Sequence, residues 1–264
     1  MRIELNGKPA DVDDPTVFSL LNRAKPGGYA TVNGYSVSED IPLEEGMSVC
    51  LFRKDEVPSA SDLDALLSAR DTPGIRSKMK GGRVGIAGLG GLGSNVAVML
   101  ARAGVGHLLL VDCDTVDATN LNRQDYVMSD IGCPKTEALS RRISQINPNV
   151  EVETADVRVT EDNAVSLFSG CGIVIEAFDG AESKAMLINT LLSGTDCIVI
   201  SGNGVAGIGP ANDIRTTEPM SRLVMCGDGT TEAGPGCGLT AAHVMVAASH
   251  QANAAVRLII SQSV

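Results

Sequence analysis

The chain has 264 residues, enough for one large hydrophobic core or for a core with a small additional domain. Hydrophobic residues make up 44% of it and charged residues 20%, proportions typical of a globular protein and not of a disordered chain or a coiled coil. The formal net charge is -11, so the chain as a whole has no electrostatic footprint for nucleic acid or for an anionic membrane surface. Any anionic ligand must be held by local groups.

Two further classes are disfavoured by the distribution of residues. The segment from Met1 to Leu5 lacks the pattern of a signal peptide, and no apolar run is long enough for a membrane span, so we expect a cytoplasmic protein. The seven cysteines are an odd number, are dispersed and include no Cys-x-x-Cys pair. This pattern argues against a disulfide framework and against a four-cysteine zinc site. No zinc is expected.

The first 57 residues have the pattern of a small α+β domain. Residues 2–5, 30–32 and 47–52 are expected to be short strands, and a helix is expected to start near Asp14. This order predicts a β-grasp, ubiquitin-like domain over residues 1–57.

Residues 58–82 have a different composition. They carry charge, Pro58, Pro73 and a Gly-Gly pair, with a helix expected over residues 60–70. We therefore expect a linker that contains a helix.

Beyond the linker, apolar strands alternate with helical patterns. Strands are expected at residues 84–87, 105–111, 150–154, 172–176 and 197–201, and helices at residues 95–103, 135–146, 161–168 and 181–192. This alternation is typical of an α/β fold, and it predicts a Rossmann-like, mostly parallel sheet with helices on both faces over residues 83–264.

A glycine-rich turn lies between the first strand and the first helix of this second domain. Gly88, Gly90 and Gly93 form a Gly-x-Gly-x-x-Gly frame, and Gly91 removes one more side chain. Such a turn lets the backbone approach phosphate oxygens and directs the N–H groups of the helix N-terminus at their charge. Asp112 follows the second strand, 19 residues after Gly93, where a carboxylate can accept hydrogen bonds from ribose hydroxyls. These features alone fit a dinucleotide site equally well.

Two cations favour ATP over a dinucleotide. Arg123 and Lys135 stand twelve residues apart, after the predicted second strand. A triphosphate carries about four charges that need fixed cations, whereas the pyrophosphate of NAD carries about two and is usually met by backbone N–H groups.

This run of residues resembles the ThiF/MoeB family of adenylating enzymes, which is related to the ubiquitin-activating enzymes. The resemblance covers roughly residues 75–260, and its motifs are Gly-Leu-Gly-Gly-Leu-Gly at 88–93, Asp112-x-Asp114-x-Val116, Asn120-Leu121-Asn122-Arg123-Gln124 and Gly132-x-Pro134-Lys135.

The resemblance implies an ATP site and a magnesium ligand. Asp179, at the end of a later strand, stands where the family has a magnesium-binding aspartate, although Gly180 replaces the asparagine that usually follows. The residues implied to surround ATP are Gly88, Gly90, Gly91, Gly93, Asp112, Asp114, Asn120, Arg123, Gln124 and Lys135. Arg123, Lys135 and Asp179 are the implied catalytic residues, and ATP and magnesium the implied substrate and cofactor.

The family's reaction is the attack of a C-terminal glycine carboxylate on the α-phosphate of ATP, which gives an acyl-adenylate and pyrophosphate. The resemblance therefore implies an adenylyltransferase for a small β-grasp sulfur carrier protein with a Gly-Gly tail, closest to the ThiF type of thiamine biosynthesis. Family members commonly form homodimers in which an arginine reaches the partner's ATP. Arg70 and Arg76 are the candidates in this chain.

The sequence departs from the family at two further places. Relatives often carry two Cys-x-x-Cys zinc pairs, which are absent from this sequence. Some relatives use a loop cysteine for a covalent link to the carrier, and Cys226, then Cys237, are the candidates, in a Gly/Thr-rich stretch expected to be a mobile loop.

The predicted N-terminal domain resembles the sulfur carrier ThiS but lacks its Gly-Gly tail, because Phe52 is followed by Arg53-Lys54. It therefore cannot be adenylylated at its own end. A carrier for molybdopterin or cysteine synthesis, a non-catalytic nucleotide-binding scaffold and an NAD-dependent oxidoreductase remain as alternatives for the whole chain.

Overall fold

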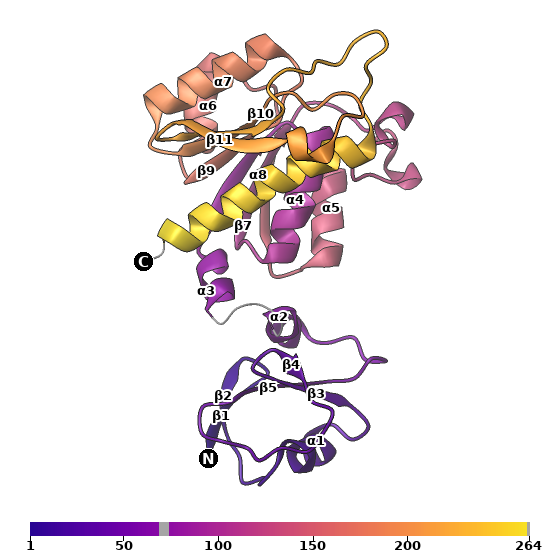
Figure 1. Cartoon of the computed structure of the whole chain (residues 1–264), viewed down its shortest axis with the longest axis vertical. Coiled ribbons are helices and arrows are strands. Elements are labelled where there is room, and N and C mark those ends of the chain that lie inside the picture. The colour runs from indigo at the N-terminus through magenta and orange to yellow at the C-terminus, as the bar shows by residue number, and fades with distance from the viewer. Residues whose placement is uncertain (69–73, 263–264) are drawn as a thin grey trace. The chain divides into compact units, whose positions relative to one another are not determined.

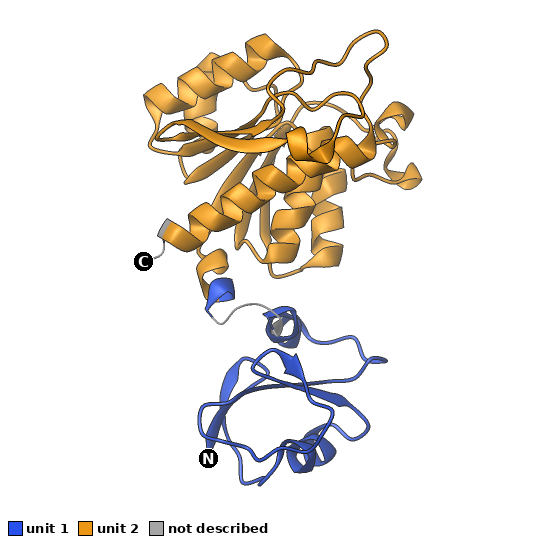
Figure 2. Ribbon diagram, in the orientation of Figure 1, with its two compact units in different colours: residues 1–76 blue, residues 77–264 orange. Residues whose placement is uncertain are grey.

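The computed structural model describes residues 1–68 and 74–262, and the chain divides into two compact units, residues 1–76 and 77–264 (Figures 1 and 2). The domain boundary expected near Val57 remains a prediction of the sequence. In the described parts of the chain, no helix is both long enough and apolar enough to cross a membrane.

The first unit is a β-grasp fold, as the sequence predicted. Its five-stranded sheet has the order β2-β1-β5-β3-β4. The helix expected from the run that starts at Asp14 begins at Val17, because Thr16 caps it by accepting a hydrogen bond from the backbone N–H of Ser19 at 3.2 Å. The elements are β1 (Arg2–Leu5), β2 (Lys8–Asp11), α1 (Val17–Ala24), β3 (Tyr29–Val32), β4 (Tyr35–Ser36), β5 (Ser48–Phe52) and α2 (Ala60–Ser68).

The helix α2 covers part of the sheet of this unit. Val49 and Leu51 of β5 face the hydrophobic core that includes α1, so Cys50 between them faces the opposite side. The Cys50 thiol donates a hydrogen bond to the carbonyl of Ala65 in α2 at 3.8 Å, and both residues are buried. The expected linker helix is thus packed against the β-grasp sheet.

The second unit contains a seven-stranded sheet in the order β11-β12-β10-β9-β6-β7-β8. All neighbouring strands are parallel except the edge pair of β11 and β12. The boundary between the units falls within α3 (Ile75–Lys80). The elements that follow among the described residues are β6 (Arg83–Ala87), α4 (Gly91–Ala103), β7 (His107–Asp112), α5 (Lys135–Ile146), β8 (Glu151–Asp156), α6 (Glu161–Phe168), β9 (Ile173–Glu176), α7 (Ala181–Gly194), β10 (Ile198–Gly202), β11 (Arg215–Met220), β12 (Leu223–Gly227) and α8 (Ala241–Gln262), with three short 3-10 helices.

Helices cover both faces of this sheet, which confirms the predicted Rossmann-like fold. α4, α5 and α8 lie on one face, and α6 and α7 pack on the other (Figure 1). The chain order reverses between β6 and β9, because β7 and β8 extend the sheet on one side of β6, while β9, β10 and β12 extend it on the other. In open α/β sheets, ligands bind at the carboxyl ends of the strands beside such a switch point.

The C-terminal part of the sheet differs from the sequence prediction. Residues 224–229 were expected to lie in a mobile loop, but Leu223–Gly227 form β12, which pairs with β10 and β11. The apolar run Leu-Val-Met-Cys is too short to predict a strand by itself, and β12 forms because it lies between β10 and β11 in the sheet. The alanine-rich helix α8 was also not predicted.

Candidate functional site

The glycine turn, residues 88–93, follows β6 at the switch point. Gly88 has a φ of +89°, and a Cβ at this position would lie 2.9 Å from the carbonyl oxygen of Ala177. A Cβ at Gly93 would overlap the carbonyl oxygen of Gly88. At Gly90, by contrast, the nearest atom to a Cβ would be Gln124 Nε2 at 3.9 Å. Gly88 and Gly93 are therefore required by packing, whereas Gly90 leaves its backbone open to a ligand.

The turn borders a cavity of about 370 Å³, here called the glycine-turn cavity. It lies at the carboxyl ends of β6, β7 and β9, and its walls also include the start of α5. Of the residues proposed for ATP and magnesium, those that line the cavity are Gly88, Gly90, Gly91, Asp112, Asp114, Arg123, Gln124, Lys135 and Asp179. The cavity is also lined by residues that no motif of the sequence marked, namely Cys113, Arg158, Phe178 and Ser183.

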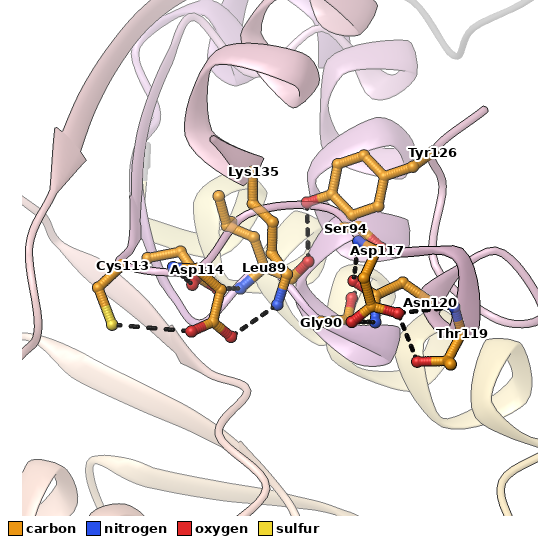
Figure 3. A network of polar contacts seen from close by, with 11 residues as sticks. Leu89, Gly90, Ser94, Cys113, Asp114, Asp117, Thr119, Asn120, Tyr126 and Lys135 are labelled. Atoms are coloured by element: carbon orange, nitrogen blue, oxygen red, sulfur yellow. Dashed lines mark hydrogen bonds and ion pairs between the residues drawn. The ribbon is translucent and has the colours of Figure 1, made fainter. Parts of the chain in front are cut away.

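Asp112 fixes the geometry of the turn. One of its carboxylate oxygens accepts a hydrogen bond from the backbone N–H of Leu89 at 2.6 Å, and the other accepts one from the N–H of Asp114 at 2.8 Å. Tyr126 adds a second tie by donating its hydroxyl to the carbonyl of Leu89 at 2.9 Å (Figure 3). The end of β7 and the turn after β6 are thereby held together at the rim of the cavity.

Lys135 is held in place by an acidic neighbour. Its ammonium group donates to Asp114 Oδ2 at 2.9 Å (Figure 3). The lysine side chain is 8% exposed and that of Asp114 is 61% exposed. The pair therefore joins a buried ammonium group to a solvent-accessible carboxylate. An anion entering the cavity would therefore meet a lysine whose position is already set.

Arg123 and Gln124 offer polar atoms that protein groups leave unused. Arg123 donates to the carbonyl of Thr119 at 3.2 Å and to Asn122 Oδ1 at 2.8 Å. Its Nε and the Oε1 of Gln124 are buried, and neither has a hydrogen-bond partner in the described parts of the chain. Buried polar atoms are rarely left unsatisfied, so these two indicate a position for a polar ligand.

Asn120 does not enter the cavity, although the resemblance implied a contact with ATP. Its amide donates to Asp117 Oδ2 at 3.1 Å, and its Oδ1 accepts from the N–H of Asp117 at 3.2 Å (Figure 3). These bonds cap the 3-10 helix Ala118–Asn120. In this structure Asn120 shapes the loop that carries Arg123.

Asp179 lies between the glycine-turn cavity and a second one. The second cavity has a volume of about 310 Å³ and shares Gly91, Ala177, Phe178, Asp179 and Leu239 with the first. Its remaining wall is formed mainly by two segments, residues 202–206 at and after the end of β10 and residues 231–233. The side chain of Asp179 is exposed, so its carboxylate is accessible from both cavities.

The candidate cysteines lie in different environments. Cys226 is fully buried in β12, and burial raises the pKa of its thiol to about 11 against the lowering effect of a hydrogen bond with Thr216. This environment disfavours the thiolate that covalent chemistry needs. Cys237 is half-buried in the loop before α8.

The two arginines proposed to reach a partner's ATP are placed differently. Arg76 lies in the first unit, where its Nε donates to Asp64 at 3.0 Å and its side chain is 7% exposed. Arg70 lies outside the described residues.

These features define a nucleotide-binding α/β protein with a β-grasp unit in the same chain. The ThiF family model matches residues 64–263, and a ThiS-like ubiquitin model matches residues 1–55. The chain belongs to the ThiF family, which includes ATP-dependent adenylating enzymes.

The individual relatives that the chain resembles differ from one another in function. The chain is 44% identical over 105 residues to the tRNA threonylcarbamoyladenosine dehydratase of Escherichia coli, an alignment that covers 39% of each chain. It is 34% identical over 128 residues to the adenylyltransferase and sulfurtransferase UBA4 of Yarrowia lipolytica, covering 48% of this chain and 31% of the relative. The matches thus span well under half of these relatives' lengths.

The fold is shared with a solved structure. The E. coli tRNA N6-threonylcarbamoyladenosine dehydratase in complex with ATP superposes with a TM-score of 0.70 at 23% identity, covering 79% of this chain and 98% of that one. At this identity the match shows a common fold.

Proposed function

We propose that this protein adenylylates the C-terminal glycine carboxylate of a small β-grasp sulfur carrier, using ATP and releasing pyrophosphate, in thiamine biosynthesis. The observation that carries the proposal is the junction of the two cavities at Asp179. One cavity has the cations and the glycine turn that suit a triphosphate, and the other adjoins it at Asp179 and includes glycine and alanine residues that suit contact with a Gly-Gly tail.

ATP fits the donors of the glycine-turn cavity. The open position at Gly90 directly precedes α4, and the positive N-terminal end of this 13-residue helix favours phosphate charge. Arg123 and Lys135 add two fixed cations, and the unpaired Nε of Arg123 supplies a further donor. Asp112 is then available to the ribose only in part, because both of its oxygens already accept backbone hydrogen bonds.

Magnesium fits the carboxylate of Asp179. Mg²⁺ prefers oxygen ligands and is commonly bound by one or two carboxylates together with substrate phosphates. When bound, the ion would neutralise charge on the phosphates as pyrophosphate leaves. Gly180 offers no side chain, so Asp179 is the protein ligand that we propose at this end of β9.

The second cavity fits the carrier's tail. Gly202, Gly204 and Ala206 are among its lining residues, and at the two glycines Leu92 and Asp228 fill the space that a side chain would take, so the main chain itself forms this wall. A carboxylate is ionised at neutral pH and needs no general base, so the site has only to align it with the α-phosphate and neutralise charge.

The N-terminal unit also supports sulfur-carrier chemistry. Its ThiS-like fold is the carrier's own fold, but Arg53 and Lys54 stand where a carrier has its terminal glycines. The substrate we propose is therefore a separate carrier protein.

A second candidate function is the modification of tRNA, because relatives up to 44% identical are tRNA threonylcarbamoyladenosine dehydratases. The net charge of -11 is unfavourable for it, since tRNA binding depends on neutralising phosphates with lysine and arginine. The charge and the ThiS-like unit together favour the carrier.

The test is exchange of labelled pyrophosphate into ATP. We expect exchange that depends on added magnesium and on a Gly-Gly carrier, and fastest with the thiamine carrier. Consumption of ATP that depends on tRNA bearing threonylcarbamoyladenosine, with no response to any carrier, would instead support the second candidate.

We also propose a homodimer in which Arg76 reaches the partner's ATP. An Arg76→Ala protomer mixed with an Asp179→Asn protomer should then recover part of the wild-type exchange rate, because one of the two hybrid sites is intact. No rescue in this mixture, together with no rescue when Arg70→Ala takes the place of Arg76→Ala, would exclude a shared site.

A further inference from the structure

A buried carboxylate lies directly before the Asp179 turn. Glu176 is the last residue of β9 and is 0% exposed. It accepts hydrogen bonds from the backbone N–H of Phe178 at 2.7 Å and from the Ser201 hydroxyl at 2.6 Å. A buried carboxylate is costly unless it is paired, so its partners are fixed parts of this site.

Lys184 supplies the compensating charge. Its Nζ lies 3.2 Å from Glu176 Oε1 and 3.1 Å from Oε2, and its side chain is 21% exposed where that of Glu176 is 0%. An ammonium group has three N–H donors, and no partner other than Glu176 is found for Nζ in the part of the chain that the structure describes. Lys184 also lines the second cavity, so a ligand in that space is within reach of its side chain.

The charges that line the second cavity make Lys184 the group that can attract an anionic ligand. Among the described residues that line it, Lys184 is the one cation, while Asp179 and Glu232 are anions. A carboxylate entering this cavity would be repelled by both acids. Lys184 lies in the first turns of α7, five positions after Asp179, where the helix N-terminus also favours negative charge.

We propose that Lys184 binds the terminal carboxylate of the acceptor substrate, and that Glu176 is a positioning residue that holds the lysine for this contact. The inference rests on the proposed function, because it assumes an acceptor with a free carboxylate in the second cavity. No motif of the sequence marked either residue, although Lys184 stands only five positions after Asp179, the proposed metal ligand, at the start of the next predicted helix.

The contact predicts that the protein distinguishes a carboxylate from an uncharged amide at the acceptor's end. A hydrogen bond to a charged group contributes enough for about a tenfold difference in dissociation constant. A role of Lys184 limited to packing would change the binding of both acceptors equally.

The probes are a thiamine-type carrier protein ending in Gly-Gly carboxylate and the same protein ending in Gly-Gly carboxamide, with dissociation constants measured by calorimetry in the absence of ATP. We expect the wild-type full chain to bind the carboxylate form about tenfold more tightly. Lys184→Met should abolish the difference, Lys184→Arg should retain part of it, and ATP affinity, measured by displacement of a fluorescent nucleotide, should change much less.

Two further variants control for folding and net charge. Glu176→Gln combined with Lys184→Met removes both charges and leaves no unpaired buried carboxylate, so it should fold and also lose the preference. Arg102→Met removes one positive charge from an exposed position at the far end of α4 and should keep it.

The outcomes separate the two proposals. Wild-type exchange and binding with an unchanged carboxylate preference in Lys184→Met and in the double variant would overturn the assignment of Lys184 alone. A wild-type protein that neither binds a carrier nor shows carrier-dependent exchange would overturn the proposed function and this inference with it.

Discussion

The charged side chains of the two cavities differ in whether a neighbouring side chain pairs with them, and this difference decides what the loss of each charge would do. Lys135 is paired with Asp114, and Lys184 is paired with Glu176. Asp179 is exposed, and within the described ranges no side chain forms an ion pair with it. Removing its charge should therefore affect ligands more than the fold.

Asp179→Asn should lower the magnesium-dependent exchange rate by at least about tenfold, with a much smaller loss of ATP affinity, because the charge acts mainly as pyrophosphate leaves. Exchange kinetics over a range of magnesium concentrations and a nucleotide-displacement assay measure the two effects. The matched control is Asp196→Asn, an exposed aspartate before β10 at the opposite end of the strands. Equal losses of rate and ATP affinity would remove the metal assignment.

At the scale of the secondary-structure element, the glycines of the glycine turn differ in function: Gly93 is needed for packing, whereas Gly90 leaves space for a ligand. Gly93→Ala should destabilise the fold by about 1–3 kcal/mol, the range for overpacked positions, because its Cβ would overlap the carbonyl of Gly88. Gly90→Ala meets no atom closer than 3.9 Å and should leave thermal stability nearly unchanged while it weakens ATP binding. Thermal denaturation and nucleotide displacement on the same samples check this, and a Gly90 variant with full ATP affinity would contradict the proposed phosphate position.

The loop after β12 depends on the ionised form of Asp228. Burial raises the pKa of its carboxyl, but hydrogen bonds from Thr231 and Thr230 outweigh this and lower the pKa to about 2 from 3.8. Thr231 in turn accepts a hydrogen bond from the N–H of Ala206 at 3.1 Å, so Asp228 joins both loop segments that form the second cavity.

Because the folded-state pKa is lowered, the stabilisation is complete above about pH 4 and is lost as the pH falls toward about 2. Asp228→Asn should imitate the protonated form at neutral pH and speed hydrogen exchange at the amides of Thr230 and Thr231. Asp213→Asn, at an exposed residue that precedes β11, serves as the control. Equal protection in the Asp228 variant and the wild type would show that the loop does not need this carboxylate.

At the scale of the whole molecule, the N-terminal unit is proposed to be a docking or dimerisation module and not a substrate. Removal of residues 1–57 would leave α2 without the sheet against which Ala65 packs, so this truncation should be less soluble than one that begins at Ile75. If the module blocks the carrier, either truncation should raise exchange with a separate carrier. If the module is structural, the dimer should dissociate.

Size-exclusion chromatography, thermal denaturation and pyrophosphate exchange measured on both truncations distinguish these roles. The second unit has its own core, so the shorter chain should still unfold cooperatively. Truncated proteins that match the full chain in activity, solubility and oligomeric state would exclude both roles for the module.

The amino-acid sequence by itself determined the local elements. The limits of α5 and α6 were predicted to the residue, and the strands that lead into the glycine turn and into Asp112 were placed within one or two residues. Their signals are periodic apolar residues and helix-ending residues such as Asn147, which act over a few positions. The resemblance to the ThiF/MoeB family implied that Gly90, Arg123, Lys135 and Asp179 surround one ligand, and all four line the glycine-turn cavity.

Only the tertiary structure decided which hydrogen-bond or ion-pair partner each side chain takes and which side chains are buried. Asn120 turns to Asp117 and not to the cavity, Cys226 is sealed inside β12, and the Glu176–Lys184 pair places a cation beside Asp179. β12 itself forms because β10 and β11 satisfy its backbone hydrogen bonds. Such choices depend on burial and on partners distant in the chain, which no local pattern of residues encodes.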